Sequence, residues 1–60
     1  MVRFKELREA AGLTQQGVAE RIGVTQQAVD QWEHGVFMPR ADKLTELAEI
    51  LGCEVVELLT

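Results

Sequence analysis

Apolar residues recur along most of the chain at the three- and four-residue spacing that gives a helix one apolar face. Capping residues and glycines interrupt this pattern and divide it into five segments. The pattern predicts helices over residues 3–11, 15–22, 41–51 and 54–59, with a further short helix between Thr25 and Gly35. We therefore expect an all-α fold of five helices.

The apolar faces of these segments predict one shared hydrophobic core. Because a chain of 60 residues buries only about 60% of its unfolded surface, every helix has to contribute to that core. We expect residues 1–60 to form a single domain. The residues expected to point inward are Phe4, Leu7 and Ala11, then Val18, Ala19 and Ile22, then Ala28, Val29 and Trp32, then Leu44, Leu47, Ala48 and Leu51, and finally Val55 and Leu58, with Val56 and Leu59 as further candidates.

Side chains suited to helix ends mark the boundaries between the segments. Thr14 and Thr25 can each accept a hydrogen bond from a backbone N–H in the first turn of the helix that follows. Gly23 is expected in a left-handed conformation, where it sets the angle between two helices. The other glycines expected to end helices are Gly12, Gly35 and Gly52.

Residues 13–35 contain two short amphipathic helices joined by Gly23-Val24-Thr25, which predicts a helix-turn-helix. The second of these helices has two different faces. Trp32 shares its apolar arc with Ala28 and Val29, so it is interpreted as a core anchor rather than a base-stacking residue. The opposite arc is polar and consists of Gln26, Gln27, Asp30, Gln31 and His34.

The glutamines on this polar arc favour DNA binding. A glutamine amide offers a donor and an acceptor side by side, which matches N6 and N7 of adenine in the major groove. In the helix-turn-helix docking mode, residues near the start of the second helix contact base edges. Gln26, Gln27 and Gln31 occupy those places. One such glutamine would be interpreted as an ordinary surface residue, but three on one face indicate base contact.

The chain resembles the lambda-repressor-like, Cro/C1 (XRE) family. The resemblance covers nearly the whole chain, and Thr25-Gln26-Gln27 with Gln31 is similar to the recognition helix of the phage 434 repressor. It implies a five-helix fold and a DNA-binding regulator of a bacterium or phage. The residues that carry it are Leu13-Thr14-Gln15, Ala19, Gly23-Val24-Thr25, Trp32-Glu33 and Gly35.

The resemblance also implies roles for residues outside the polar arc. Gln15 matches a position that meets the DNA backbone and braces the first recognition glutamine, and Arg40 matches a loop arginine near the minor groove. Helix N-termini favour phosphate without a cation, which places Thr14 and Thr25 beside the DNA backbone as well. Arg8 matches the arginine that pairs with the glutamate of the Trp-Glu motif, so we expect an ion pair with Glu33, at least partly buried.

Several positions depart from the family pattern. Gly17 stands where a helix former is usual; we expect it to be exposed and to cost about 1 kcal/mol of helix stability. Glu54 replaces the usual serine or threonine cap, and Cys53 is expected to be buried and structural rather than reactive. Val36, Phe37 and Met38 replace loop cations; we expect them to fold inward over Trp32, with a contact to another subunit as the alternative.

The formal net charge of -4 is unusual for a nucleic-acid-binding domain. The negative charge is unevenly distributed, since residues 1–23 carry a net charge of +1 and residues 24–60 carry -5. Most of the acidic residues therefore lie on helices that, in the resembled family, face away from DNA.

Composition argues against several other functions. With Cys53 and His34 as the only cysteine and histidine, we expect no internal disulfide and no metal site. No catalytic or nucleotide-binding motif is present, so we expect no enzyme, no cofactor and no small-molecule ligand. No apolar run approaches the roughly 20 residues that span a bilayer, and no signal-peptide pattern is present. We expect a cytoplasmic protein.

Two functions follow as hypotheses. The first is a sequence-specific regulator that binds double-stranded DNA, with two copies on a two-fold operator whose half-sites are about one helical turn apart. The alternative is a protein-interaction or dimerisation module of the same fold, in which DNA binding is weak or lost. The acidic balance and the missing loop cations favour the alternative.

Overall fold

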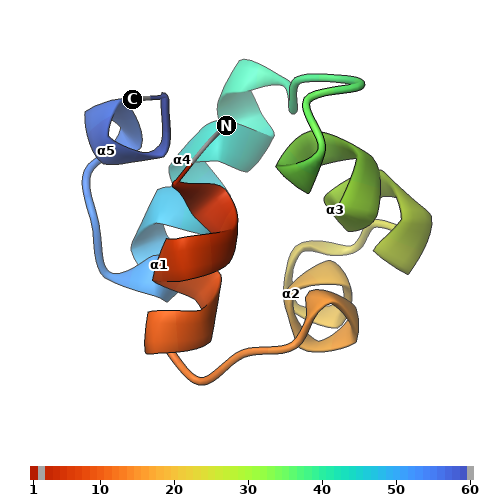
Figure 1. Ribbon diagram of the computed structural model, residues 1–60, viewed down its shortest axis with the longest axis horizontal. Helices are drawn as coiled ribbons and strands as arrows, with labels where there is room; N and C mark the ends of the chain where they lie inside the picture. The colour runs from red at the N-terminus through yellow and green to blue at the C-terminus, as the bar shows by residue number, and fades with distance from the viewer. Residues whose placement is uncertain (2, 60) are drawn as a thin grey trace.

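The computed structural model describes residue 1 and residues 3–59, so Val2 and Thr60 lie outside the description that follows. The described residues contain no strand, and the all-α fold of five helices is confirmed. Residues 15–22 and 41–51 form helices as predicted, the first helix is one residue shorter at each end, and the last begins one residue later. The helices are α1 (Phe4–Ala10), α2 (Gln15–Ile22), α3 (Gln26–Glu33), α4 (Ala41–Leu51) and α5 (Val55–Leu59) (Figure 1).

The starts of α2 and α3, and the turn between these helices, have the capping geometry expected from their residues. Oγ1 of Thr14 accepts a hydrogen bond from the N–H of Gly17 at 2.9 Å, and Oγ1 of Thr25 accepts one from the N–H of Ala28 at 3.1 Å. Gly23 has φ of 72°, in the left-handed region where a β-carbon is penalised. These contacts determine where each helix begins and how the two are joined.

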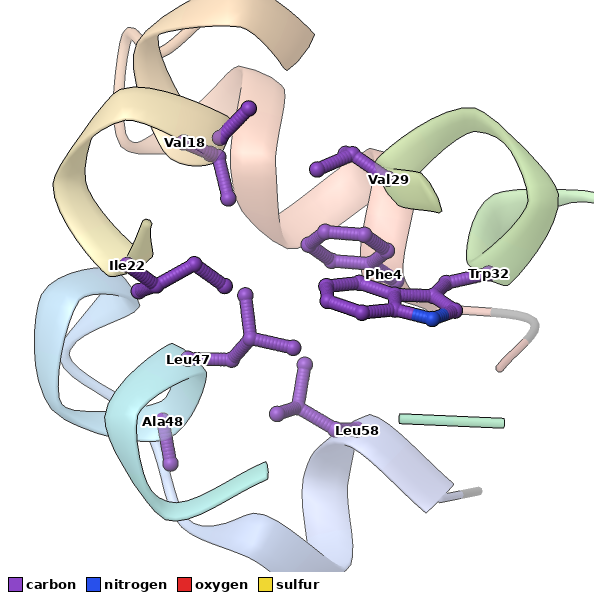
Figure 2. Close-up of a cluster of buried hydrophobic side chains, with 9 residues drawn as sticks. Phe4, Val18, Ile22, Val29, Trp32, Leu47, Ala48 and Leu58 are labelled. Atoms are coloured by element: carbon purple, nitrogen blue, oxygen red, sulfur yellow. The ribbon is translucent and has the colours of Figure 1, made fainter. Parts of the chain in front are cut away.

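The core lies where the five helices meet, and every helix contributes to it (Figure 2). Trp32 is buried in this cluster, which confirms it as a core residue. Leu7, Val24, Ala28 and Val55 are partly buried against the same cluster. Among the described residues, the core cluster consists of Phe4, Val18, Ala19, Ile22, Val29, Trp32, Leu47, Ala48 and Leu58.

Some expected core positions are less buried than predicted. Ala11 is exposed at the end of α1, and the buried residue beside Phe4 on that helix is Arg8 instead. Leu44 and Leu51 are half-buried. Cys53 is also half-buried, because it follows Gly52 in the connection to α5 at the margin of the core.

The expectation that residues 36–38 cover Trp32 is wrong. Val36, Phe37 and Met38 are 60%, 60% and 55% exposed, whereas Pro39 is buried. Trp32 is already enclosed by the helices, so little of its apolar surface remains for this loop to cover. Val56 and Leu59, the further core candidates on α5, are exposed instead, because Val55 and Leu58 occupy the face of α5 that packs against the core.

The helices are arranged so that α2 and α3 lie side by side at one side of the molecule, while α5 lies at the opposite side (Figure 1). The helix-turn-helix pair therefore presents its outer surface on a side that α5 does not cover.

None of the described helices combines the length and apolar character that crossing a lipid bilayer requires.

Candidate nucleic-acid interface

The polar face of α3 is accessible at each glutamine that the sequence singled out. Gln26 and Gln27 are exposed in the first turn, directly after the Thr25 cap, and Gln31 is half-buried one turn later. The apolar residues Val29 and Trp32 hold the opposite face of α3 in the core. The helix is therefore anchored on one side and free to meet a ligand on the other.

The first turns of α2 and α3 add hydrogen-bond donors to this surface. Thr14 and Thr25 are exposed at the two helix starts, and Gln15 is half-buried in the first turn of α2. Backbone N–H groups at a helix start lack partners within the helix, and the helix dipole makes such a site favourable for anions. This surface can hold phosphate groups without a lysine or arginine.

Gln15 connects α2 to α3 through three side-chain hydrogen bonds. Its Nε2 donates to Oδ1 of Asp30 at 3.0 Å and to Oε2 of Glu33 at 2.7 Å. Its Oε1 accepts a longer bond of 3.4 Å from Nε2 of Gln26. The structure thus contains the contact between Gln15 and the first glutamine of α3 that the resemblance implied.

A buried ion pair lies directly beneath this cluster. Nε of Arg8 is 2.5 Å from Oε1 of Glu33, and both side chains are nearly fully buried. The same guanidinium donates to the backbone oxygen of Leu13 at 2.7 Å. No buried side-chain nitrogen or oxygen among the described residues lacks a hydrogen-bond partner. The predicted Arg8–Glu33 pair is confirmed, and it joins α1 to α3 and to the segment before α2.

Asp30 takes part in this arrangement, although sequence reasoning placed it only on the polar arc. One carboxylate oxygen accepts from Gln15, and its backbone oxygen lies 2.8 Å from Nδ1 of His34. Its position four residues after Gln26 and four before His34 was a usable signal, because side chains at this spacing are neighbours on a helix. Its bond to Gln15 could not be derived without the packing of α2 against α3.

Lys43 is a second residue that sequence reasoning missed. Its Nζ donates to the backbone oxygen of Ile22 at 2.9 Å and to Oε2 of Glu46 at 3.3 Å. Ile22 ends α2, and the last carbonyls of a helix have no partner within that helix. Lys43 therefore caps α2 from α4 and supports the turn that positions α3.

Arg40 and His34 complete the polar residues near the ends of α3 and α4. Arg40 is exposed and directly precedes α4, so its charged group is accessible to a ligand. His34 is exposed at the end of α3. In the described part of the chain, no three side chains of His, Cys, Asp and Glu are grouped as a metal ion would require. Besides the charged group of Arg40, this surface offers hydrogen bonding by amides and hydroxyls.

Comparison with known proteins agrees with this geometry. A helix-turn-helix family profile matches residues 4–58. Relatives include an uncharacterized HTH-type transcriptional regulator, y4dJ, of Sinorhizobium fredii, which is 44% identical over 57 residues, covering 95% of this chain and 74% of the relative. Another uncharacterized HTH-type transcriptional regulator, from Methanothermobacter thermautotrophicus, is 40% identical over 54 residues, covering 90% of this chain and 78% of the relative.

A third relative is the SPbeta prophage-derived uncharacterized HTH-type transcriptional regulator YonR of Bacillus subtilis. It is 38% identical over 50 residues, covering 83% of this chain and 46% of the relative. No significant match to a solved structure was found. The family profile, the relatives and the five-helix arrangement agree, and the chain belongs to the helix-turn-helix family of the Cro/C1 (XRE) type.

Proposed function

We propose that this chain is a DNA-binding transcriptional regulator that reads a specific sequence in the major groove with α3. The observation that carries the proposal is the accessible polar face of α3, where Gln26 and Gln27 are exposed directly after the Thr25 cap. A helix of this kind fits the major groove, and its first residues are the ones that reach base edges. The names of the relatives, all HTH-type transcriptional regulators, support the same function.

In this proposal the glutamines read bases. Gln26, Gln27 and Gln31 contact base edges, and the donor and acceptor of each amide suit adenine better than other bases. We propose that Thr25-Gln26-Gln27 and Gln31 correspond to the recognition helix of the phage 434 repressor. Gln31 is half-buried, so its contact is made by the tip of the side chain.

Other residues position the protein on the DNA backbone. Thr14, Gln15 and Thr25 lie at helix starts, where hydroxyls, amides and unpaired backbone N–H groups can bind phosphate oxygens. Arg40 is exposed before α4 and lies at or near the minor groove in this assignment. These contacts carry no sequence information themselves, but they determine which bases the glutamines meet.

Part of the acidic charge behind the net charge of -4 lies away from the proposed DNA-binding surface. Glu54 and Glu57 are in or next to α5, at the side of the molecule opposite to α2 and α3 (Figure 1). Neutral donors supply most of the proposed phosphate contacts, and such contacts release fewer counterions than lysine or arginine. The affinity should therefore depend less steeply on salt than that of a basic domain of the same size.

We further propose that two copies bind a two-fold operator, with half-sites about 34–36 Å apart. Exposed apolar residues in the loop after α3 and on α5 can be buried between two copies. These residues are Val36, Phe37, Met38, Val56 and Leu59.

The test begins by selecting bound sequences from a random pool of duplexes. The dissociation constant of the selected duplex is then compared with those of duplexes that carry each single base-pair change. Gln26→Ala should lower affinity by roughly 5- to 150-fold and relax discrimination at one base pair. Gln16→Ala is the matched control, because Gln16 is exposed on α2 and bonds Glu20 rather than a residue of α3. A loss with Gln26→Ala that is equal for all duplexes would refute base reading by Gln26.

A protein-interaction module is the second candidate function. The five exposed apolar side chains and the missing loop cations favour it. Titration with duplex DNA at two salt concentrations, combined with light scattering, separates the two candidates. A protein that self-associates without DNA and binds no duplex at either salt concentration has the second function.

A further inference from the structure

Three large apolar side chains lie in solvent in the loop between α3 and α4 (Figure 1). Val36, Phe37 and Met38, which we call the apolar loop, are 60%, 60% and 55% exposed. Adjacent exposed apolar residues on a small domain mark a surface that another molecule covers. The core does not need their cover, since Trp32 is only 7% exposed without it. The apolar loop is therefore available to a partner outside the domain.

The apolar loop is held in a fixed position relative to α3. Gly35 has φ of 74°, and its N–H donates to the backbone oxygen of Trp32 at 3.3 Å. The N–H of Val36 donates to the backbone oxygen of Gln31 at 3.0 Å. This pair of bonds is the Schellman motif, which ends a helix with a defined geometry. Because Pro39 is buried at the other end of the loop, the apolar loop and α3 form one rigid unit.

The acidic residues of the chain are absent from three segments. All ten Asp and Glu residues lie outside residues 10–19, 21–29 and 34–41, which are the longest stretches without them. The first two segments include the starts of α2 and α3, which belong to the proposed DNA-binding surface. The third includes the apolar loop. Because phosphates repel carboxylates, the absence of acids from the third segment favours DNA as its partner.

The exposed apolar residues of α5 have a different charge environment. Val56 and Leu59 lie within two residues of Glu57, and Glu54 precedes both. A partner of α5 must come close to these carboxylates, which a protein surface can do and a phosphate backbone cannot do without repulsion. Charge therefore separates the two apolar surfaces, since α5 suits a protein and the apolar loop suits DNA.

The dimensions of α3 place the apolar loop beside the DNA backbone. A helix of eight residues is about 12 Å long, whereas the major groove is about 8.5 Å deep. When the first turn of α3 contacts base edges, its last turn and the loop after it lie at the level of the sugars and phosphates. Apolar side chains gain nothing against phosphates. The apolar DNA surface within their reach is that of the sugars and base steps in the minor groove.

We infer that the apolar loop inserts into the minor groove beside the base pairs that α3 reads, where Phe37 opens a base step and bends the DNA. Apolar side chains inserted in this way unstack base pairs and kink the duplex by roughly 20–90°. Pyrimidine–purine steps open at the lowest cost, so such a step is favoured at a position that α3 does not touch. The inference rests on the proposed function. It assigns the apolar loop to DNA and leaves Val56 and Leu59 for a second copy.

The first test measures bending of the selected duplex with fluorescent dyes at its two ends, at saturating protein concentration. The wild-type protein should raise energy transfer between the dyes, because bent DNA brings its ends closer together. Phe37→Ala should remove most of this increase and lower the affinity by roughly tenfold. Leu59→Ala is the control, because Leu59 is 50% exposed on α5, at the side of the molecule opposite to α3. This substitution should leave the bend at the wild-type value.

A second measurement needs no variant and so does not depend on how Phe37→Ala folds. The adenine analogue 2-aminopurine, whose fluorescence rises when it is unstacked, replaces one adenine at a time within and beside the selected site. In the wild-type complex, a position outside the base pairs read by α3 should become brighter on binding. The positions that the glutamines of α3 contact should stay dim, since reading base edges leaves the bases stacked.

The outcomes separate the inference from the proposed function. A selected duplex that stays straight, or in which no position becomes brighter, overturns the inference while the proposed function stands. A bend that Phe37→Ala leaves unchanged overturns it as well. If that variant also loses dimers in light scattering without DNA, the apolar loop contacts a second copy instead. If the wild-type protein binds no selected duplex, the proposed function fails and the inference fails with it.

Discussion

Arg8 and Glu33 are 25 positions apart in the chain, yet they form an ion pair in which only 9% and 4% of the two side chains are exposed. The pair connects α1 to the end of α3, and Arg8 also binds the backbone oxygen of Leu13. It lies beneath the proposed DNA-binding surface. Its loss should therefore affect both the stability of the domain and the position of α3.

Arg8→Ala should lower the free energy of unfolding by about 3 to 5 kcal/mol, because it leaves the carboxylate of Glu33 buried without its cation. A domain of 60 residues has a total stability of only about 3 to 9 kcal/mol, so much of the variant should be unfolded at room temperature. Circular dichroism during urea and thermal unfolding measures this loss. Arg3→Ala is the control, since the Arg3–Glu6 pair is solvent-exposed and should contribute less than about 1 kcal/mol. Equal small losses in both variants would contradict a stabilising role for the buried pair.

Lys43→Met should lower the free energy of unfolding by about 1 to 2 kcal/mol. The substitution keeps much of the apolar part of the side chain but leaves the terminal carbonyl of Ile22 without the ammonium group. Urea denaturation followed by the fluorescence of Trp32 measures the change. Glu46→Ala removes the other partner of Lys43 but keeps the bond to Ile22, so its loss should stay below about 0.5 kcal/mol. If the two variants lose equal stability, the bond to Ile22 contributes nothing measurable.

Much of the fold could be predicted from the sequence because its determinants are local. The spacing of Val18 and Ile22 in α2, the threonine caps and the left-handed Gly23 each act within a few residues. The ion pair between Arg8 and Glu33 is not local. It was expected from the family resemblance and from the position of both residues at the edge of an apolar face.

The contacts between helices and the exposure of the loop after α3 could not be predicted, because they depend on how segments distant in the sequence pack together. The bonds of Lys43 to Ile22 and of Gln15 to Asp30 join different helices, and no spacing along the chain indicates them. The exposure of Phe37 was predicted wrongly because an apolar residue is expected inside when the available core surface is unknown. Trp32 is only 7% exposed although Val36, Phe37 and Met38 remain in solvent, so its burial does not need these three residues.

Cys53 should titrate at a higher pH in the folded protein than in the unfolded chain. Burial is the largest cause, and it raises the pKa of the thiol above the ordinary value of 9.0. The negative charge of Glu57 raises the pKa further, the positive charge of Arg3 lowers it, and Glu54 adds a smaller increase. The folded state therefore holds the proton more tightly. The protonated thiol of Cys53 therefore stabilises the folded state. This contribution is fully present below the pKa of Cys53 in the unfolded chain and is lost as the pH rises through its pKa in the folded state.

Absorbance of the thiolate, followed against pH in buffer and in concentrated urea, measures the two titrations of Cys53. The titration in buffer should have the higher midpoint. Cys53→Ala removes the only cysteine of the chain and so gives the background absorbance to subtract. Coincident titrations in buffer and urea would contradict the prediction.

Gly17→Ala should raise the free energy of unfolding by about 0.5 to 1 kcal/mol, because alanine loses less backbone entropy than glycine in a helix. Contrary to the sequence prediction, Gly17 is half-buried and not exposed. A β-carbon at this position would lie 3.2 Å from Oγ1 of Thr14, so the threonine hydroxyl would have to shift by a few tenths of an ångström. The chain shows that this arrangement is tolerated, since Ala28 has the same place beneath the hydroxyl of Thr25. Gly23→Ala is the matched control and should lower stability by about 1 kcal/mol, because φ of 72° penalises a β-carbon. Thermal unfolding gives the melting temperature of each variant relative to the wild type. A melting temperature of Gly17→Ala below that of the wild type would mean that crowding against Thr14 outweighs the gain in helix propensity.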